Sequence, residues 1–307
     1  MSYVGYVQYL FHAILKSFGL FYLAIMIGFS SSSAQACAFN CDKTPELRAS
    51  GFAAKSDAAT PYANGYKGEM PALQMANADT AKVIIWLHGQ GNPRKKEFCS
   101  AQYNLPPRSI LQLDKAENTH VYYHCTAVID PKVKKDNVAD DGIHYTNGYA
   151  MGYYTVGRRD ELQGLLDKFH EIGVKPSNIS LAGHSAGAWT ALLAAASYPE
   201  KFHAVIAFAP AFAGPRNEEN IYPWWRKIVR PEQIAMMTQP NNVPKLVFAY
   251  EDDVFNRPSE LAFLTKAFPN SATLISQKCG KGHNTHKIDC ALDATVNLMK
   301  DVIYGQK

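Results

Sequence analysis

Runs of like charge are missing from this chain, and so is an uninterrupted apolar run of the length that a membrane span needs. Of its 307 residues, 31 are basic and 27 are acidic, and no five like charges follow one another. The sequence therefore excludes a polybasic arm of the kind that binds nucleic acid. The uncharged apolar block at residues 18–29 is shorter than the about 20 residues of a membrane-spanning helix. A repeat of fixed period is also lacking, which argues against a solenoid or a propeller.

The N-terminus has the pattern of a secretory signal. Lys16 precedes the apolar block, and Ala34-Gln35-Ala36 matches the small-residue cleavage pattern, with Cys37 as the first mature residue. We therefore expect a signal peptide over residues 1–36 and a secreted or periplasmic protein. An uncleaved anchor, helped by the apolar stretch 4–15, and a lipidated Cys37 remain as alternatives. Only in those two cases do we expect a membrane partner.

Cysteine is scarce, and every cysteine lies after the expected cleavage point. An even number of cysteines in an exported chain favours disulfide bonds, and their spacing suggests local pairs. Cys279–Cys290 is the first pair expected, because it would close a short loop. Cys37–Cys41 and Cys99–Cys125 follow by elimination, while other connectivities stay open.

Apolar runs typical of strands alternate with helical patterns from residue 81 onward. The expected strands are residues 81–89, 119–129, 177–183, 203–210, 244–250 and 271–276, and the expected helices are 157–172, 186–199 and 290–304. Strands that are apolar on both faces and alternate with helices predict the α/β class. The sheet should be mostly parallel and doubly wound, with helices on both faces.

The strand pattern also predicts the domain organisation. Residues 37–75 are polar and are expected to form an N-terminal surface segment, and residues 76–307 form one domain. The strand pattern lapses over residues 211–243, where we expect a short insertion. Long insertions are commonly lids. We expect Trp224 and Trp225 to pack this insertion onto the domain, with substrate contact as the alternative role.

Residues 179–190, ISLAGHSAGAWT, place a lone serine between two glycines where a strand turns into a helix. Such a sharp turn leaves no room for side chains two residues before and after the serine, the positions of Gly183 and Gly187. Ser185 would then hold a strained conformation with its hydroxyl exposed, at a helix N-terminus whose dipole favours a developing negative charge. This arrangement resembles the nucleophile elbow of the α/β-hydrolase superfamily, and the resemblance implies the α/β-hydrolase fold.

The resemblance also implies an oxyanion hole made of two backbone N–H groups. One belongs to the residue after the nucleophile, here Ala186. The other comes from the loop after an early strand. The sequence HGQG at residues 88–91 resembles the HG-x-x loops of the superfamily, which assigns the second amide to Gln90.

The superfamily order of nucleophile, acid and histidine predicts an acid after a later strand. The run KLVFAYEDDVF places Glu251, Asp252 and Asp253 there. In the usual pattern the acid lies three residues after a strand-end glycine. Tyr250 stands in the glycine's place here, which selects Asp253 and leaves Asp252 as the alternative.

The general base is expected in GKGHNTH, residues 280–286, before the last helix. His283 follows a glycine, the usual setting in the superfamily, and His286 is the alternative. The spacing Cys279-x3-His283-x2-His286-x3-Cys290 could instead hold zinc. A disulfide between the two cysteines would remove both thiolates, so we expect no metal and no cofactor.

Taken with the N-terminal signal, the resemblance implies an exported serine hydrolase that cleaves small-molecule or polymeric carboxylic esters through an acyl-enzyme. Its loop and export pattern resemble the secreted-esterase, polyhydroxybutyrate-depolymerase-like and dienelactone-hydrolase-like branches. Three alternatives stay open: a peptidase of the same fold, a catalytically silent hydrolase-fold binding protein, and a membrane-anchored interaction protein that keeps residues 4–29.

Overall fold

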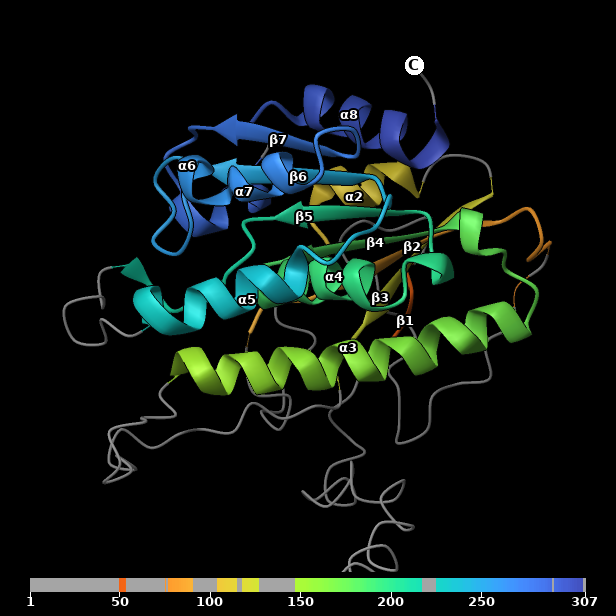
Figure 1. Ribbon diagram of the computed structural model, residues 1–307. Coiled ribbons are helices and arrows are strands. Elements are labelled where there is room, and N and C mark those ends of the chain that lie inside the picture. The colour runs from red at the N-terminus through yellow and green to blue at the C-terminus, as the bar shows by residue number, and fades with distance from the viewer. Residues whose placement is uncertain are drawn as a thin grey trace, which may run out of the picture. The chain divides into compact units, whose positions relative to one another are not determined.

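The structure is a computed structural model (Figure 1). It describes residues 50–53, 75, 77–90, 104–114, 118–126, 147–216, 225–288 and 290–305. The expected signal peptide, most of the expected surface segment 37–75 and the Cys37–Cys41 pair lie outside these residues. None of the helices within the described ranges is both long enough and apolar enough to cross a membrane.

Seven strands in the described part of the chain form one sheet in the order β1-β3-β2-β4-β5-β6-β7. Neighbouring strands are parallel except β1 and β3, which are antiparallel. The short strand β1 comes from the segment that we expected at the surface, and it extends one edge of the sheet. The strands are β1 (Gly51–Phe52), β2 (Lys82–Leu87), β3 (Thr119–His124), β4 (Ile179–His184), β5 (Ala204–Phe208), β6 (Lys245–Tyr250) and β7 (Ala272–Gln277).

Strands that are apolar on both faces have a helical layer on each side, as expected. In β2, Val83, Ile85 and Leu87 pack in one hydrophobic cluster with residues of α3 (Asn147–Glu171) and α4 (Ala186–Ser197). The alternating residues Ile84 and Trp86 pack in a second cluster with α2 (Arg108–Leu113) and α8 (Leu292–Tyr304). Figure 1 shows these helices on opposite faces of the sheet. The chain therefore has the expected α/β-hydrolase fold.

The helices follow their sequences. In α4 the small residues let the helix lie close to the sheet, and ten of its residues are buried. In α8 the buried residues Val296, Met299 and Ile303 recur at helical spacing. Helix α3 begins ten residues before the expected start, in a stretch with two glycines that carries no helical signal. The remaining helical segments are η3 (Pro176–Asn178), η4 (Pro199–Lys201), η6 (Trp225–Val229), α5 (Arg230–Met237), α6 (Pro258–Leu261), α7 (Phe263–Ala267) and η7 (Gly282–Lys287).

The described part of the insertion contains η6, a π-helical turn, followed by α5. Trp225 at its start is 1% exposed. A Cβ atom on Gly214 would stand 1.7 Å from Cε3 of that ring, and Gly214 has a φ of +69°. A glycine is thus required where Trp225 packs, and this tryptophan has the packing role that we expected. Trp224 lies outside the described residues.

The carboxyl ends of four parallel strands lead to the expected site residues. The His88–Gln90 loop follows β2, Ser185 follows β4, Asp253 follows β6, and His283 in η7 follows β7. In an open parallel sheet, residues at these ends gather at one edge, where ligands bind.

Candidate active site

Ser185 joins the end of β4 to the first turn of α4 in a backbone conformation that L-residues rarely adopt. Its φ is 59° and its ψ is −121°. The amide of Ser185 donates to Phe208 O at 3.0 Å, and its carbonyl accepts from Trp189 N at 3.0 Å. Strain of this kind costs about 1–3 kcal/mol and persists only where the surroundings determine it, commonly at functional sites. The hydrogen bonds on both sides of the serine hold the strained residue in place.

The two glycines beside the serine are sites where backbones touch. A Cβ on Gly183 would stand 2.6 Å from the carbonyl carbon of Gly187, and a Cβ on Gly187 would stand 2.1 Å from Leu87 O. No larger residue fits either position without moving backbone. The close approach of Gly187 also brings the start of α4 against the end of β2.

The loop after β2 lies beside the serine. A Cβ on Gly89 would stand 3.4 Å from Ser185 Cβ. His88 is fully buried, and its Nε2 accepts a hydrogen bond from the backbone N–H of Thr126 at 3.3 Å. The proton of the neutral ring is therefore on Nδ1, which donates to Gly89 O at 2.6 Å. In a trans peptide the C=O and the next N–H point in opposite directions, so the N–H of Gln90 points away from His88.

A buried arginine from α3 supports the same loop. Arg158 is 1% exposed, and its Nη2 donates to His88 O at 2.8 Å. Burial, and then the charge of Arg158, holds the pKa of His88 well below its usual value. The ring stays neutral, which keeps Nε2 an acceptor and fixes the peptide between Gly89 and Gln90.

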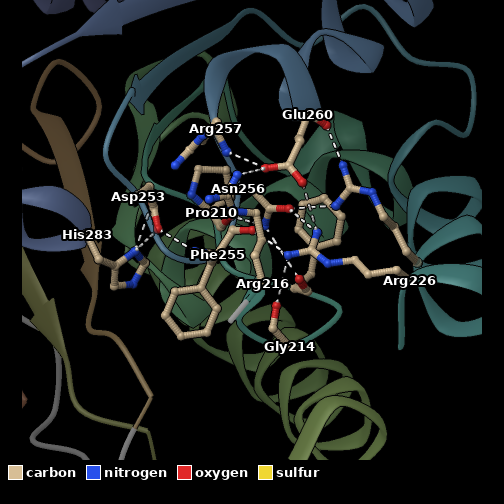
Figure 2. A network of polar contacts seen from close by, with 12 residues as sticks. Pro210, Gly214, Arg216, Arg226, Asp253, Phe255, Asn256, Arg257, Glu260 and His283 are labelled. Atoms are coloured by element: carbon tan, nitrogen blue, oxygen red, sulfur yellow. Dashed lines mark hydrogen bonds and ion pairs between the residues drawn. The ribbon is translucent and has the colours of Figure 1, made fainter. Parts of the chain in front are cut away.

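Asp253 is buried and pairs with the partly exposed imidazole of His283 (Figure 2). The Nδ1 of His283 lies 2.9 Å from Oδ2 and 3.1 Å from Oδ1 of Asp253, which is 0% exposed. Oδ1 also accepts from the backbone N–H of Phe255 at 2.7 Å. The other ring nitrogen of His283, Nε2, makes no hydrogen bond to any described residue. No hydrogen bond joins it to the Ser185 hydroxyl within the described contacts, and such bonds often form only when substrate binds.

The alternative acid lies elsewhere. Asp252 is exposed, and its Oδ2 accepts from the backbone N–H of Gly282 at 2.9 Å. Both aspartates thus hold the histidine loop, but it is Asp253 that contacts the imidazole of His283. The alternative base, His286, is 6% exposed and stacks on His184, with ring centroids 3.7 Å apart.

His184 links the elbow to the histidine loop. Its Nε2 donates to the backbone carbonyl of His283 at 2.8 Å, and the two ring centroids are 4.6 Å apart. Burial lowers the pKa of both His184 and His286 well below the usual value, with neighbouring positive charge adding to the effect. Two neutral imidazoles therefore pack behind His283.

A disulfide closes the histidine loop, since Cys279 is bonded to Cys290 as expected. Because the bond uses both thiols, the alternative zinc site loses two of its four ligands. The described residues contain no cluster of three or more side chains that could hold a metal ion. Cys125 is also disulfide-bonded, and its expected partner, Cys99, lies outside the described residues.

Sequence reasoning missed a set of residues around Asp253. Asn256 is 0% exposed, and its Nδ2 donates to Pro210 O at 2.9 Å. Arg226 and Arg230, from the insertion, donate to Asn256 Oδ1 (Figure 2 draws the Arg226 contact). The two arginine contacts join residues that are 26 and 30 positions apart, so local sequence pattern does not predict them. The insertion itself was the only sequence signal for them.

Comparisons with known proteins bear on the family and the fold of the chain. Residues 76–262 match the model of a family described as "Putative esterase". No curated protein matches the chain. Among solved structures, DcsB in complex with its substrate analogue is 15% identical with a TM-score of 0.50, covering 73% of this chain and 90% of that one. At that identity, the likeness shows a shared fold.

Two further solved structures are also similar. A thermophilic esterase from the Planctomycetes species Thermogutta terrifontis, with propionate bound, is 15% identical with a TM-score of 0.46, over 75% of this chain and 85% of that one. Est1E from Butyrivibrio proteoclasticus, with ferulic acid bound, is 15% identical with a TM-score of 0.47, over 74% and 92%.

Proposed function

This chain belongs to the Esterase family and is an ester-hydrolysing α/β hydrolase, and we propose that Ser185, His283 and Asp253 are its catalytic triad. The observation that carries the proposal is the Asp253–His283 pair, whose imidazole lies against His184, the residue before a serine held at positive φ. Each residue follows a different strand of one parallel sheet, in the chain order of this fold.

The proposed reaction is acyl transfer to water. His283 takes the proton of the Ser185 hydroxyl through Nε2 while the serine oxygen attacks the ester carbonyl. Asp253 orients the ring through Nδ1 and stabilises the imidazolium that forms. His283 then protonates the leaving alcohol, and a water molecule, activated by the same histidine, releases the acid from the acyl-enzyme.

The tetrahedral intermediate needs two N–H donors for its negative oxygen. We assign them to Gln90 and Ala186. Support for Gln90 comes from the Gly89 peptide, whose carbonyl is tied to His88 and whose α-carbon lies beside Ser185. Support for Ala186 is its position as the first residue of α4, where the helix dipole favours negative charge.

We also propose that the enzyme is exported and that its substrate is a small-molecule or polymeric ester. The Cys279–Cys290 bond supports export, because disulfide bonds persist mainly in oxidising compartments. The signal pattern of residues 1–36 supports it from the sequence. Sequencing the N-terminus of the exported protein tests this point, and the proposal predicts Cys37 as the first residue.

Substitution of the triad tests the chemistry. Ser185→Ala should remove labelling by a fluorophosphonate and lower kcat on a simple aryl ester by about 10⁴-fold or more. Asp253→Asn should lower kcat by about 10⁴-fold with the fold intact, because the wrong tautomer of His283 is then favoured. Asp252→Asn is the matched control, since its carboxylate accepts from the backbone N–H of Gly282 in the histidine loop and does not contact the imidazole of His283.

Two results would overturn the assignment. Full esterase activity of the Ser185→Ala enzyme would exclude this serine as the nucleophile. A larger loss from Asp252→Asn than from Asp253→Asn would move the acid by one residue. A panel of aryl esters and peptide amides, run with the wild-type enzyme, separates an esterase from a peptidase of the same fold.

A further inference from the structure

We propose that Arg226 of the insertion is a positioning residue for Asp253, so that the insertion completes the acid side of the active site. This inference rests on the proposed triad. It assigns a role to a segment whose contacts lie on the far side of Asp253 from the imidazole (Figure 2).

The first step is what fixes the carboxylate. Asp253 Oδ1 accepts from the backbone N–H of Phe255 at 2.7 Å, and both oxygens face Nδ1 of His283. The amide of Asp253 donates to Tyr250 O at 3.1 Å. The orientation of the carboxylate therefore depends on the backbone at Phe255, two residues further along the same loop.

The second step is what fixes Phe255. Its carbonyl accepts from Nη2 of Arg226 at 2.6 Å. The same guanidinium reaches Gly214 O at 3.3 Å, Asn256 Oδ1 at 3.3 Å and Glu260 Oε1 at 3.4 Å. A planar fork of five donors can hold several acceptors in one geometry, which a lysine ammonium cannot reproduce. Arg226 thus joins three parts of the chain: the loop 251–257, which carries Asp253 and which we call the acid loop; the loop after β5, which contains Gly214; and helix α6.

The third step is the burial of this contact. The Arg226 side chain is 9% exposed, and Asn256, which it contacts, is 0% exposed. Arg230 donates to Asn256 Oδ1 at 2.6 Å and stacks over the Phe212 ring at 4.9 Å. Buried charges of this kind are costly unless they are paired and hydrogen-bonded. Carbonyls and Glu260 supply those partners, so the contact is built into the core beside the acid.

Arg216 offers a matched comparison within the same cluster. Its Nη1 lies 3.8 Å from Glu260 Oε2, and its side chain is 27% exposed. The contact that it makes with the acid loop is through its own backbone N–H, to Val254 O at 2.7 Å. Arg216→Ala therefore removes the same charge beside the same carboxylate without removing a side-chain hydrogen bond to the acid loop.

The experiment measures kcat and KM on an aryl ester for Arg226→Ala, Arg226→Lys and Arg216→Ala. A misplacement of about 1 Å costs about 10²-fold in rate. We expect a loss of that size in kcat for Arg226→Ala with KM changed less than threefold, a partial loss for Arg226→Lys, and little change for Arg216→Ala. Millimolar guanidinium ion should restore part of the kcat of Arg226→Ala, and methylammonium should not.

A double-mutant cycle with Asp253→Asn decides between positioning and general packing. If Arg226 acts through Asp253, then Arg226→Ala lowers kcat little further in the Asp253→Asn background. Losses that multiply in full, or equal losses from Arg226→Ala and Arg216→Ala, would overturn the inference. Should Arg226→Ala fail to fold, Arg226→Lys carries the same cycle. Failure of the triad itself is visible separately, as full activity of Ser185→Ala or Asp253→Asn alone.

Discussion

Ser185 and the His88–Gln90 loop leave β4 and β2, which lie inside the sheet, whereas Asp253 follows β6, one strand in from the edge, and His283 follows the edge strand β7. Every residue of β4 and of β6 is buried, while none of β7 is. Around the serine, backbone lies directly against backbone, as at Gly187 and Leu87. We call these two parts the nucleophile half and the acid–histidine half.

Side chains and a covalent bond hold the acid–histidine half. Arg226 and Asn256 fix the acid loop, and the Cys279–Cys290 bond closes the histidine loop. The nucleophile half thus depends on the close packing of the core, whereas the acid–histidine half depends on contacts between loops. Substitutions should therefore act differently in the two halves.

The largest effect is expected at the backbone contact of the nucleophile half. Gly187→Ala brings a Cβ to within 2.1 Å of Leu87 O, so backbone must move. We expect a loss of unfolding free energy of about 3 kcal/mol or more and no measurable esterase activity. Urea unfolding and a turnover assay on the same preparation check both.

Gly164→Ala in α3 is the control for this substitution. An added Cβ there meets nothing within 4 Å, and alanine stabilises a helix interior relative to glycine by about 0.5–1 kcal/mol. Equal unfolding free energies for the two variants would contradict the contact that the comparison rests on.

The acid–histidine half is tested by opening its disulfide. The double substitution Cys279→Ser and Cys290→Ser frees a loop of sequence separation 11 and should lower the unfolding free energy by about 3 kcal/mol. Because the bond encloses His283, kcat should also fall. Hydrogen exchange read by peptide should quicken over residues 278–290.

The nucleophile half supplies the internal control for the disulfide experiment. Exchange over residues 82–87 and 179–184, in β2 and β4, should quicken only by the factor that the lower unfolding free energy sets, whereas residues 278–290 should also exchange through local opening. A uniform increase across both halves would mean that the disulfide supports the whole domain and that the two halves do not differ in this respect.

The same contrast explains what the sequence could predict. The nucleophile elbow could be predicted from the sequence, because one sharp turn requires Gly183, Ser185 and Gly187 at fixed local positions. The succession of strands β2 to β7 along the chain, and the helices on both faces of the sheet, followed from continuous apolar runs. The sequence favours Asp253 and keeps Asp252 as the alternative acid, because Tyr250 occupies the usual glycine position and local pattern does not show which carboxylate reaches the imidazole.

The supports of the site were not predictable in the same way. Arg158 contacts the His88 loop across 70 positions, and Arg226 contacts Phe255 across 29. An arginine in a helix or an insertion is ordinarily a surface residue. Only the fold brings such residues against buried carbonyls, so their roles become visible from tertiary contacts and not from spacing.

The smallest effect is expected where the two halves meet, at the stacked rings of His184 and His286. Burial lowers the pKa of His286 well below 6.5, so the folded protein keeps this ring neutral while the unfolded chain binds a proton as the pH falls below that value. The part of the unfolding free energy that depends on a neutral His286 should therefore be complete above pH 6.5 and should be lost progressively as the pH falls below that value. For each such histidine the slope is about 1.4 kcal/mol per pH unit.

His286→Phe should make the unfolding free energy less dependent on pH, because the unfolded variant binds one proton fewer than the unfolded wild type. Phenylalanine keeps the stacking against His184, Trp86 and Phe208 without a titrating group. Urea unfolding between pH 7 and pH 5 measures the slope for both proteins, and the variant should become the more stable one relative to wild type as the pH falls. Because His184 and His88 are also held neutral by burial, acid sensitivity should remain in the variant. An unchanged slope would mean that His286 is protonated in the folded state, and the two halves would then meet through a charge where the structure has a neutral stack.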